Sequence, residues 1–382
     1  MMPSTESGLA GPADLAPGTT NQMISQLTPL RDAIAALNTL PPVAAQTLPV
    51  IDAVGAVLAA DLAVGPLPTQ PVALSDGYAV RAEETQDAGG YAPAKLSSPP
   101  VRVAVGDPMP VAADAVAPAD AVRIDASGAE ALAAVTAGDG CVPTGADWPG
   151  GVLRRTGERL RISDVAVLTA AGFGPLQVRK PRVTIAAVKR DAVADAVAAV
   201  IARDLAALGA TAAIAAPGDL TASLAATDTD AVVTVGATGT GQGDDAVLTL
   251  RRLGRVAAHG IALSPGETAA LGWIGSRPVL MVPGRIDAAL ATWLTIGRVL
   301  AAHLAGGAGE DRTAPAVLSR KVASTIGISD VIPVSLADGR AEPLAARYLP
   351  LSALARADGW ILVPPESEGY PAGTTVTVNS WP

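Results

Sequence analysis

Three aspartates lie in turns rich in glycine, and their positions are well suited to chemistry. Asp76 stands in a Ser-Asp-Gly turn before an extended apolar run, Asp147 follows a Thr-Gly-Ala turn, and Asp244 lies near the end of the glycine-rich stretch 236–245. A carboxylate held in a fixed position by a turn can serve chemistry. Asp-Gly is also among the commonest structural turn sequences, so Asp76 taken alone is more simply interpreted as a plain turn residue, and Asp147 has the same alternative.

The glycine-rich stretch 236–245 is the second candidate site. Glycine lets a backbone approach an anion closely, and four occur here. Asp244 or Asp245 could cap the helix that follows or hold a divalent cation. The spacing matches neither a P-loop nor a dinucleotide fingerprint, so the residues leave a ligand site and a merely flexible loop equally open.

Charge restricts the partners of the chain. The formal net charge of -9 over 382 residues supplies no basic stripe, which argues against nucleic-acid binding. An anionic ligand would have to be held mainly by arginines, backbone amides, helix N-termini or a metal ion, because lysines are few. The four lysines are Lys95, Lys180, Lys189 and Lys321.

The rare residues and the N-terminal arm favour a cytoplasmic protein. Cys141 is the single cysteine, and His259 and His303 are the only histidines, so neither a disulfide nor a cysteine or histidine metal site is expected. Residues 1–22 lack the pattern of a signal peptide and are predicted to form a disordered arm. No apolar run approaches the ~20 residues of a membrane helix, so no membrane association is expected.

The elements that would position these residues alternate between strand and helix from Arg182 onward. The pattern predicts a parallel sheet with right-handed crossovers, and such sheets bind ligands at the carboxyl ends of their strands. Arg285 follows the last of these strands and could hold a phosphate, although a solvated arginine is the simpler alternative. The predicted strands are 183–188, 211–216, 230–235 and 279–282, and the predicted helices are 193–208, 220–226 and 287–304.

The flanking regions predict two further kinds of structure. Short strands and Gly/Pro-rich turns occupy most of the chain between residues 47 and 151, and a helix is expected over 163–171. After the glycine linker at 306–309, strands at 331–336, 360–363 and 374–378 predict a small β domain.

The order of these motifs resembles that of the molybdopterin molybdotransferase family, the MoeA-like proteins that include the E domain of gephyrin. The likeness extends from about residue 27 to 380. It is carried by Asp76–Arg81 in the family's Asp-Gly-Tyr-Ala-Val-Arg signature, by Val105–Val116, Gly145–Trp148 and Gly236–Asp244, and by Val282–Ile286 in place of Leu-Pro-Gly-Asn-Pro.

The resemblance implies an α/β plus β fold in an elongated, multidomain homodimer. Its central part is a parallel α/β molybdopterin-binding domain, accompanied by a β-rich lobe and a C-terminal β domain. The expected boundaries are a linker and dimerisation region at 23–70 and 138–178, a shortened β-rich lobe at 71–137, the α/β domain at 179–308 and the C-terminal β domain at 309–382.

The resemblance also implies a function in molybdenum cofactor biosynthesis, namely the Mg²⁺-assisted insertion of molybdate into adenylylated molybdopterin with release of AMP. Asp76, Asp147 and Asp244 stand where the family keeps acidic site residues, and Asp76 and Asp244 would hold the metal. The residues that would bind the cofactor are Gly236, Gly239, Gly241, Lys189, Arg190, Pro265, Gly266, Pro283, Gly284 and Arg285.

The cationic half of the family site is altered in this chain. Ser264 and Glu267 replace both lysines of the family's Lys-Pro-Gly-Lys-Pro turn, whereas Lys189 and Arg190 stand where the family has acids. One hypothesis is a working transferase whose phosphate contacts are rearranged. A second is a non-catalytic carrier or chaperone that binds molybdopterin or the finished cofactor and passes it to, or assembles with, a recipient molybdoenzyme. A third is a pure scaffold that keeps the dimer but binds no ligand, in which the three aspartates are turn residues only.

Overall fold

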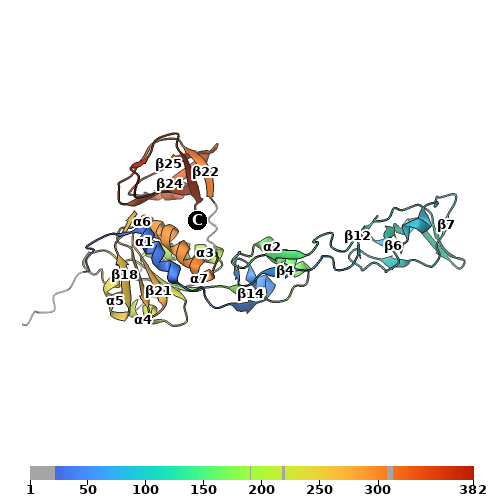
Figure 1. Ribbon diagram of the computed structural model, residues 1–382, viewed down its shortest axis with the longest axis horizontal. Coiled ribbons are helices and arrows are strands. Elements are labelled where there is room, and N and C mark those ends of the chain that lie inside the picture. The colour runs from blue at the N-terminus through green and yellow to red at the C-terminus, as the bar shows by residue number, and fades with distance from the viewer. Residues whose placement is uncertain (1–21, 190, 217–219, 308–312) are drawn as a thin grey trace, which may run out of the picture. The chain divides into compact units, whose positions relative to one another are not determined.

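The computed structural model describes residues 22–189, 191–216, 220–307 and 313–382. The chain forms two compact units (Figure 1). Unit 1 contains the described residues up to Ala44 and those from Arg179 to Pro382, and unit 2 contains Ala45–Val178. The disordered arm predicted for residues 1–22 lies outside the described residues except for Gln22, whose side chain is buried.

A six-stranded sheet with helices on both faces forms the α/β part of unit 1. Its order is β16-β15-β17-β21-β20-β18, and the first four strands are parallel, which confirms the predicted parallel arrangement. The strands are β15 (Arg182–Ala187), β16 (Thr211–Ile214), β17 (Ala231–Val235), β18 (Arg255–His259), β20 (Ala270–Ile274) and β21 (Arg277–Val282). All side chains of β17 are buried because helices cover both faces.

Two antiparallel strands, β18 and β20, extend this sheet and were not predicted. Gly272 lies in β20, where a Cβ atom would come within 2.4 Å of the carbonyl oxygen of Arg255 on β18. Glycine in a strand usually weakens a strand prediction, but here it permits this close approach.

The helices divide into two layers. Core residues of α1, α3, α6 and α7 pack with one face of the sheet, and those of α4 and α5 pack with the other. The elements are α1 (Leu30–Ala35), α3 (Ala192–Ala207), α4 (Leu220–Ala225), α5 (Ala246–Leu253), α6 (Ile286–Thr292), a π-helical turn (Trp293–Gly297) and α7 (Arg298–Ala305), with a short 3-10 helix at Ala36–Thr39. The predicted helices at 193–208, 220–226 and 287–304 are confirmed within one or two residues.

A buried ion pair joins two of these helices. The Asp204 carboxylate on α3 accepts hydrogen bonds from Arg298 Nε and Nη2, both at 2.8 Å, and from Trp293 Nε1 at 2.7 Å. Each charge is therefore compensated where water is absent, which is the condition for burying an ion pair without a large penalty.

The expectation that no apolar segment reaches membrane-spanning length is wrong for the helix Ile286–Ala305. It has 20 residues and a mean hydropathy of 1.4 over its most apolar window. However, 83% of that window is buried inside unit 1, so the apolar composition reflects a helix packed in the protein core.

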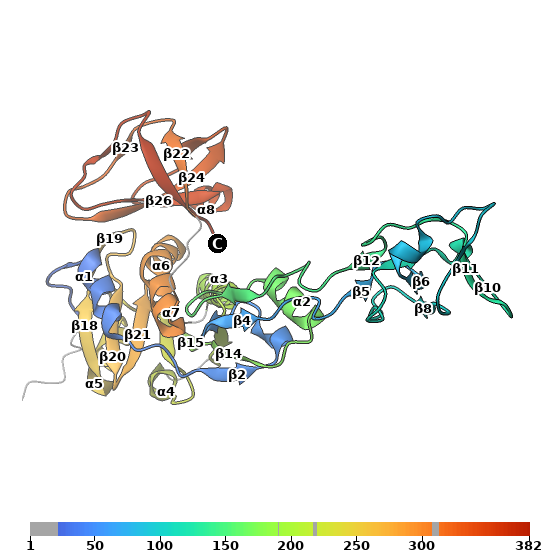
Figure 2. The ribbon, with the colours of Figure 1, turned by 45° about the vertical axis from the view of Figure 1, so that its right-hand side comes forward.

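The C-terminal strands of unit 1 close into a five-stranded barrel (Figure 2). Closure follows because β24 pairs with both β25 and β26 at the two ends of the series β25-β22-β28-β26. The barrel strands, which confirm the three predicted there, are β22 (Thr313–Leu318), β24 (Ser329–Ala337), β25 (Arg340–Pro343), β26 (Gly359–Val363) and β28 (Thr375–Ser380). The outer elements are β1 (Thr28–Pro29) and β19 (Ile261–Ser264), which extend the sheet beyond β24, the pair β23 (Val322–Ala323) and β27 (Gly369–Tyr370), and α8 (Leu351–Arg356).

Unit 2 begins with a small helix-covered region. Its sheets are β2-β14-β3 and β4-β13, and α2 packs beside them through Val165 and Leu168. Asp164 stabilises the start of α2 because its carboxylate accepts the backbone N–H of Arg161 at 2.9 Å. The elements are β2 (Gln46–Leu48), a 3-10 helix (Val50–Ala53), β3 (Val57–Leu58), β4 (Leu62–Val64), β13 (Gly151–Arg154), α2 (Ile162–Ala170) and β14 (Leu176–Arg179).

The remainder of unit 2 is a β-rich lobe with a small core made largely of alanine and valine. Its sheets are β8-β6-β9 and β10-β11-β7, and the ribbon β12-β5 leads into it. The elements are β5 (Val72–Ala73), β6 (Gly77–Val80), β7 (Ala94–Lys95), β8 (Val101–Val103), β9 (Ala115–Ala117), β10 (Val122–Asp125), β11 (Gly128–Ala131) and β12 (Cys141–Val142), with 3-10 helices at Ala82–Thr85 and Ala119–Ala121.

Candidate functional site

Three loops meet at the carboxyl edge of the α/β sheet because they follow the neighbouring parallel strands β15, β17 and β21. The loop after β17 contacts the loop after β21 directly. The Gly236 N–H donates to the carbonyl of Val282 at 2.9 Å, and a Cβ on Gly284 would lie only 3.4 Å from the Cα of Gly236. That distance is an ordinary van der Waals contact, whereas the φ of +92° at Gly236 favours glycine there, and Pro283 beside them is buried.

The half-buried Asp244 carboxylate folds back over the glycine loop (residues 236–245) that carries it. Its Oδ2 accepts the N–H of Gly241 at 3.2 Å and lies 2.7 Å from the position of a Cβ on Gly239. The predicted capping of α5 by Asp244 or Asp245 is wrong: Asp244 bonds within the loop, and Asp245 occupies the N-cap position without a side-chain hydrogen bond.

Lys189 brings a positive charge to the same loop. It is exposed two residues after β15, and its Nζ lies 3.7 Å from the position that a Cβ on Gly243 would take. The predicted neighbour Arg190 lies outside the described residues. The structure thus brings Lys189, Gly236, Gly239, Gly241, Asp244, Pro283 and Gly284 together at one edge of the sheet.

Two side chains that were not predicted hold the inner side of the glycine loop. His259 Nε2 lies 2.9 Å from the carbonyl oxygen of Thr238, and because a carbonyl only accepts, Nε2 carries the proton. The Thr238 hydroxyl is hydrogen-bonded to that of Thr268 at 3.0 Å. Through Thr268 the glycine loop is attached to the turn 264–268.

The turn 264–268 packs inward. The Ser264–Pro265 peptide bond is cis, and both Pro265 and Gly266 are buried. Gly266 has a φ of +140°, which favours glycine, and a Cβ there would make a tight contact of 3.0 Å with Thr292 Oγ1 on α6. The Glu267 carboxylate accepts the N–H of Gly266 at 3.1 Å, so it folds onto its own turn.

Arg285 reaches the site already paired. Its Nε and Nη2 donate to the buried Asp287 carboxylate at 3.1 and 2.5 Å, and its guanidinium lies 5.4 Å from the ring centroid of Tyr348. The hydrogen bond to Asp287 raises the pKa of Arg285 further, so its charge is permanent. Asp287 also accepts the N–H of Leu349 at 3.2 Å. A phosphate would therefore meet a guanidinium whose charge Asp287 largely balances.

Asp76 lies in unit 2, in the exposed turn between β5 and β6. Its Oδ1 accepts the N–H of Val105 at 2.9 Å. The next residue, Gly77, is buried, and a Cβ there would come within 2.2 Å of the carbonyl oxygen of Ala117 on β9. The Asp-Gly pair thus has a clear structural reason for its glycine and leaves the carboxylate at the surface.

Asp147 lies at the other end of the ribbon that carries Asp76. The N–H groups of Asp147 and Trp148 both donate to the carbonyl of Leu67, at 2.9 and 3.0 Å. In the antiparallel ribbon Ala73 pairs with Cys141, and the Leu74 N–H donates to Gly140, so Asp76 follows the opposite end. Within one chain the structure therefore does not bring Asp76 and Asp147 together, and Asp244 belongs to the other unit.

Among the described residues, no group of three or more His, Cys, Asp or Glu side chains is placed to hold a metal ion. The two predicted metal ligands, Asp76 and Asp244, lie in different units. Magnesium often binds through one or two carboxylates together with water and substrate phosphates, and the glycine-loop carboxylate of Asp244 fits that mode.

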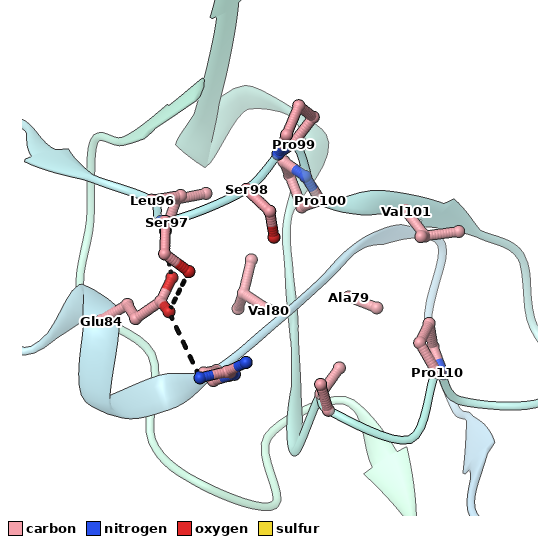
Figure 3. A pocket seen from close by; sticks show the side chains of 13 residues that line it. Ala79, Val80, Glu84, Leu96, Ser97, Ser98, Pro99, Pro100, Val101 and Pro110 are labelled. Atoms are coloured by element: carbon pink, nitrogen blue, oxygen red, sulfur yellow. Dashed lines mark hydrogen bonds and ion pairs between the residues drawn. The ribbon is translucent and has the colours of Figure 1, made fainter. Parts of the chain in front are cut away.

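A separate cavity of about 220 Å³ lies within the β-rich lobe (Figure 3). Its charged lining residues, Arg81 and Glu84, are 3.8 Å apart, and the Ser97 hydroxyl donates to Glu84 at 2.6 Å. None of the predicted site residues lines this cavity.

The comparisons with known proteins agree with this architecture. Residues 28–172 match the MoeA N-terminal region, domains I and II, and residues 315–381 match the MoeA C-terminal region, domain IV. A Methanocaldococcus jannaschii protein named for molybdopterin biosynthesis is 32% identical over 156 residues, which are 40% of this chain and 37% of that protein. The aligned part is thus well under half of that relative's length.

Solved structures show the same fold over nearly the whole chain. One is a crystal structure of the MoeA molybdopterin biosynthesis protein from Pyrococcus horikoshii. The superposition includes 94% of this chain and 100% of that protein's chain, with 24% sequence identity and a TM-score of 0.68. A molybdenum cofactor biosynthesis protein from Pyrococcus furiosus covers 93%, at 20% identity and a TM-score of 0.57. These likenesses define a multidomain protein of the MoeA fold. The two matched regions show that the chain belongs to the MoeA-like family.

Proposed function

We propose that this protein acts in molybdenum cofactor biosynthesis and binds molybdopterin at the carboxyl edge of its α/β sheet. The observation that carries the proposal is the placement of Asp244 and Lys189 at the glycine loop. The Asp244 carboxylate lies over Gly239 and Gly241, and the Lys189 ammonium group, which comes from the loop after β15, lies beside Gly243, so two neighbouring loops offer both charges to a phosphorylated ligand.

The finer proposal is that the protein inserts molybdate into adenylylated molybdopterin and releases AMP. Lys189 binds a phosphate of the substrate, and the exposed glycine loop lets the backbone approach the ligand closely. Asp244 would hold Mg²⁺, which would neutralise phosphate charge when bound. Asp76 and Asp147 remain proposed acidic site residues from unit 2.

The altered turn 264–268 favours a site with fewer positive charges than the family pattern. Glu267 adds a negative charge, and Arg285 is paired with Asp287. Lys189 therefore carries more of the binding in this proposal. Pro265 and Gly266 shape the turn and stay proposed cofactor-binding residues of this site. Retention of molybdopterin without turnover, as in a carrier or chaperone, is the alternative outcome of the test below.

The setting of this activity is also part of the proposal. We propose a homodimer in the cytoplasm that passes the product to a recipient molybdoenzyme, without binding nucleic acid or membranes. The net charge of -9 supports the absence of nucleic acid among the partners.

The test is molybdate-dependent AMP release from adenylylated molybdopterin in the presence of Mg²⁺. Asp244→Asn keeps the shape of the side chain but removes its charge, so we expect turnover to fall at least about a hundredfold. Asp228→Asn is the matched control. Asp228 is exposed just before β17, at the opposite edge of the sheet, and this change should leave turnover unaltered.

Full turnover by Asp244→Asn would refute its catalytic role. Molybdopterin retention by the wild-type protein with no AMP release would instead establish the carrier function. A wild-type protein that neither binds molybdopterin nor releases AMP would refute both.

A further inference from the structure

The side chain of Gln22 is buried against the glycine loop, although it comes from the far end of the sequence. It is 3% exposed. Its Nε2 donates to the carbonyls of Ala237 at 2.9 Å and Gly239 at 2.5 Å, and its Oε1 accepts the N–H of Val247 at 3.1 Å. One amide group thus ties the beginning of the loop to the helix that follows it.

Gln22 replaces the local cap that α5 lacks. Val247 is the second residue of α5, and its N–H is one of the amides that have no partner within a helix. Asp245 makes no side-chain hydrogen bond there, so the acceptor is supplied from 225 residues away. The start of α5 therefore depends on the segment 22–27 being in place.

Together with His259, Gln22 binds three successive carbonyls of the loop. Gln22 Nε2 donates to the carbonyls of Ala237 and Gly239, and His259 Nε2 donates to the carbonyl of Thr238. Holding these carbonyls on the protein side fixes the peptide planes of the loop. Ala237 has a φ of +56°, a conformation that costs energy in a residue with a side chain and therefore needs such support.

The segment that carries Gln22 is itself held in register. The Thr28 N–H donates to the carbonyl of Gly260 at 2.9 Å, and β1 pairs with β19. A Cβ on Gly260 would come within 2.5 Å of Ile24 Cγ2, so glycine makes room for this segment. These contacts determine where Gln22 enters the loop.

We propose that Gln22 is a positioning residue that holds the glycine loop in its ligand-binding shape. This inference rests on the proposed function of that loop. It follows that molybdopterin binding and the ordering of residues 22–27 stabilise each other, because coupling between two sites is reciprocal. Glutamine suits this role because a single side chain must donate twice and accept once.

The experiment compares Gln22→Glu with Gln26→Glu. Glutamate has the shape of glutamine but cannot donate, and at position 22 its charge would face two carbonyl oxygens. Gln26 lies in the same segment with an exposed side chain, so it controls for the added charge. Gln22→Ala is the second variant, because it removes the three hydrogen bonds of the Gln22 amide without burying a charge.

Two measurements decide the result. Hydrogen exchange of the unliganded protein reports on the loop, and we expect the amide of Val247 to exchange at least about tenfold faster in both Gln22 variants but not in Gln26→Glu. The dissociation constant for molybdopterin should rise about tenfold in the Gln22 variants. In AMP release, KM should rise while kcat changes little, because Gln22 lies beneath the loop and does not face the ligand.

Wild-type exchange at Val247 in Gln22→Ala, or wild-type affinity in both Gln22 variants, would overturn the inference. If the wild-type protein binds no molybdopterin, it is the proposed function that fails. In that case, faster exchange in the Gln22 variants that is confined to residues 237–247 would still support the role of Gln22 in holding the loop. Unchanged exchange would refute that role as well.

Discussion

Asp76 and Asp244 are two acidic turn residues of similar sequence setting that the molecule holds in different ways. Asp76 is exposed, and its carboxylate accepts one backbone N–H from Val105, 29 residues away, within the same lobe. Asp244 is half-buried over two glycines, in a loop whose carbonyls are bound by Gln22 and His259. The first turn is supported by neighbouring strands, whereas the second is supported by contacts across much of unit 1.

The two turns should therefore respond differently to substitution. The turn that carries Asp76 depends on the close packing of β6 against β9, so a substitution there should destabilise the fold of the lobe. The glycine loop depends on a few polar contacts above a large core, so its shape can change while the core persists. Mutations should therefore act mainly on stability in the lobe and mainly on binding in the loop.

The largest expected effect is on the lobe, from Gly77→Ala. A Cβ there would lie 2.2 Å from the carbonyl oxygen of Ala117 and 2.8 Å from Val116 Cγ1, and backbone cannot move away cheaply. We expect a loss of about 2–4 kcal/mol in the stability of unit 2. Chemical denaturation followed by hydrogen exchange within residues 71–137 measures it.

Gly65→Ala is the control for this change. Nothing lies within 4 Å of a Cβ at that position, so stability should alter by less than about 0.5 kcal/mol. Equal stability of Gly77→Ala and Gly65→Ala would show that the packing of β6 on β9 does not limit the lobe.

A smaller effect on stability and a larger one on binding are expected from Gly239→Ala. The new methyl group would meet Asp244 Oδ2 at 2.7 Å, but the end of a side chain can rotate away. We expect less than about 1 kcal/mol of lost stability. The dissociation constant for molybdopterin should rise about tenfold because the carboxylate is displaced. A thermal melt and a binding titration of the same variant separate the two effects, and unchanged affinity would contradict the proposed place of Asp244.

Local sequence patterns were sufficient to predict the central strands and helices of the α/β part of unit 1. Val183, Ile185 and the neighbouring apolar residues predicted β15, and the helical spacing of Val197, Ile201 and Leu205 predicted α3, because a buried strand and an amphipathic helix leave periodic patterns. The meeting of the loops after β15, β17 and β21 followed from the parallel order of the strands. The resemblance to the MoeA-like family was confirmed.

The supporting contacts of the site could not be predicted. Nothing near Gln22 in the sequence indicates that its amide binds Ala237 and Val247, because the partners are 215 and 225 residues away. Arg285 was considered as a phosphate ligand, yet its charge is balanced by Asp287 two residues later. Such pairing depends on the side-chain conformations of Arg285 and Asp287 at the start of α6, which the periodicity that predicted the helix does not determine.

The smallest expected effect concerns Glu84, a carboxylate of the lobe that is held more firmly than Asp76. The Ser97 hydroxyl donates to Glu84 at 2.6 Å and the Ser97 N–H donates at 3.1 Å, as Figure 3 shows in part. The side-chain hydrogen bond from Ser97, and then its backbone N–H, lower the pKa of Glu84 from its ordinary 4.5. The ionised form is therefore favoured by folding, and the resulting stability is present above pH 4.5 and lost as the pH falls through the folded-state pKa.

Ser97→Ala removes the hydroxyl and keeps the backbone contact, so it should lower the stability of unit 2 at pH 7 by about 0.5 kcal/mol. The difference from the wild-type protein should shrink as the pH falls below 4.5, since a protonated Glu84 gains little from this bond. Denaturation at a series of pH values measures this, with Ser98→Ala as the control from the same cavity wall. A difference between Ser97→Ala and wild type that stays constant down to pH 2 would mean that the hydroxyl acts through packing. Glu84 would then be no more firmly held by its surroundings than Asp76 is.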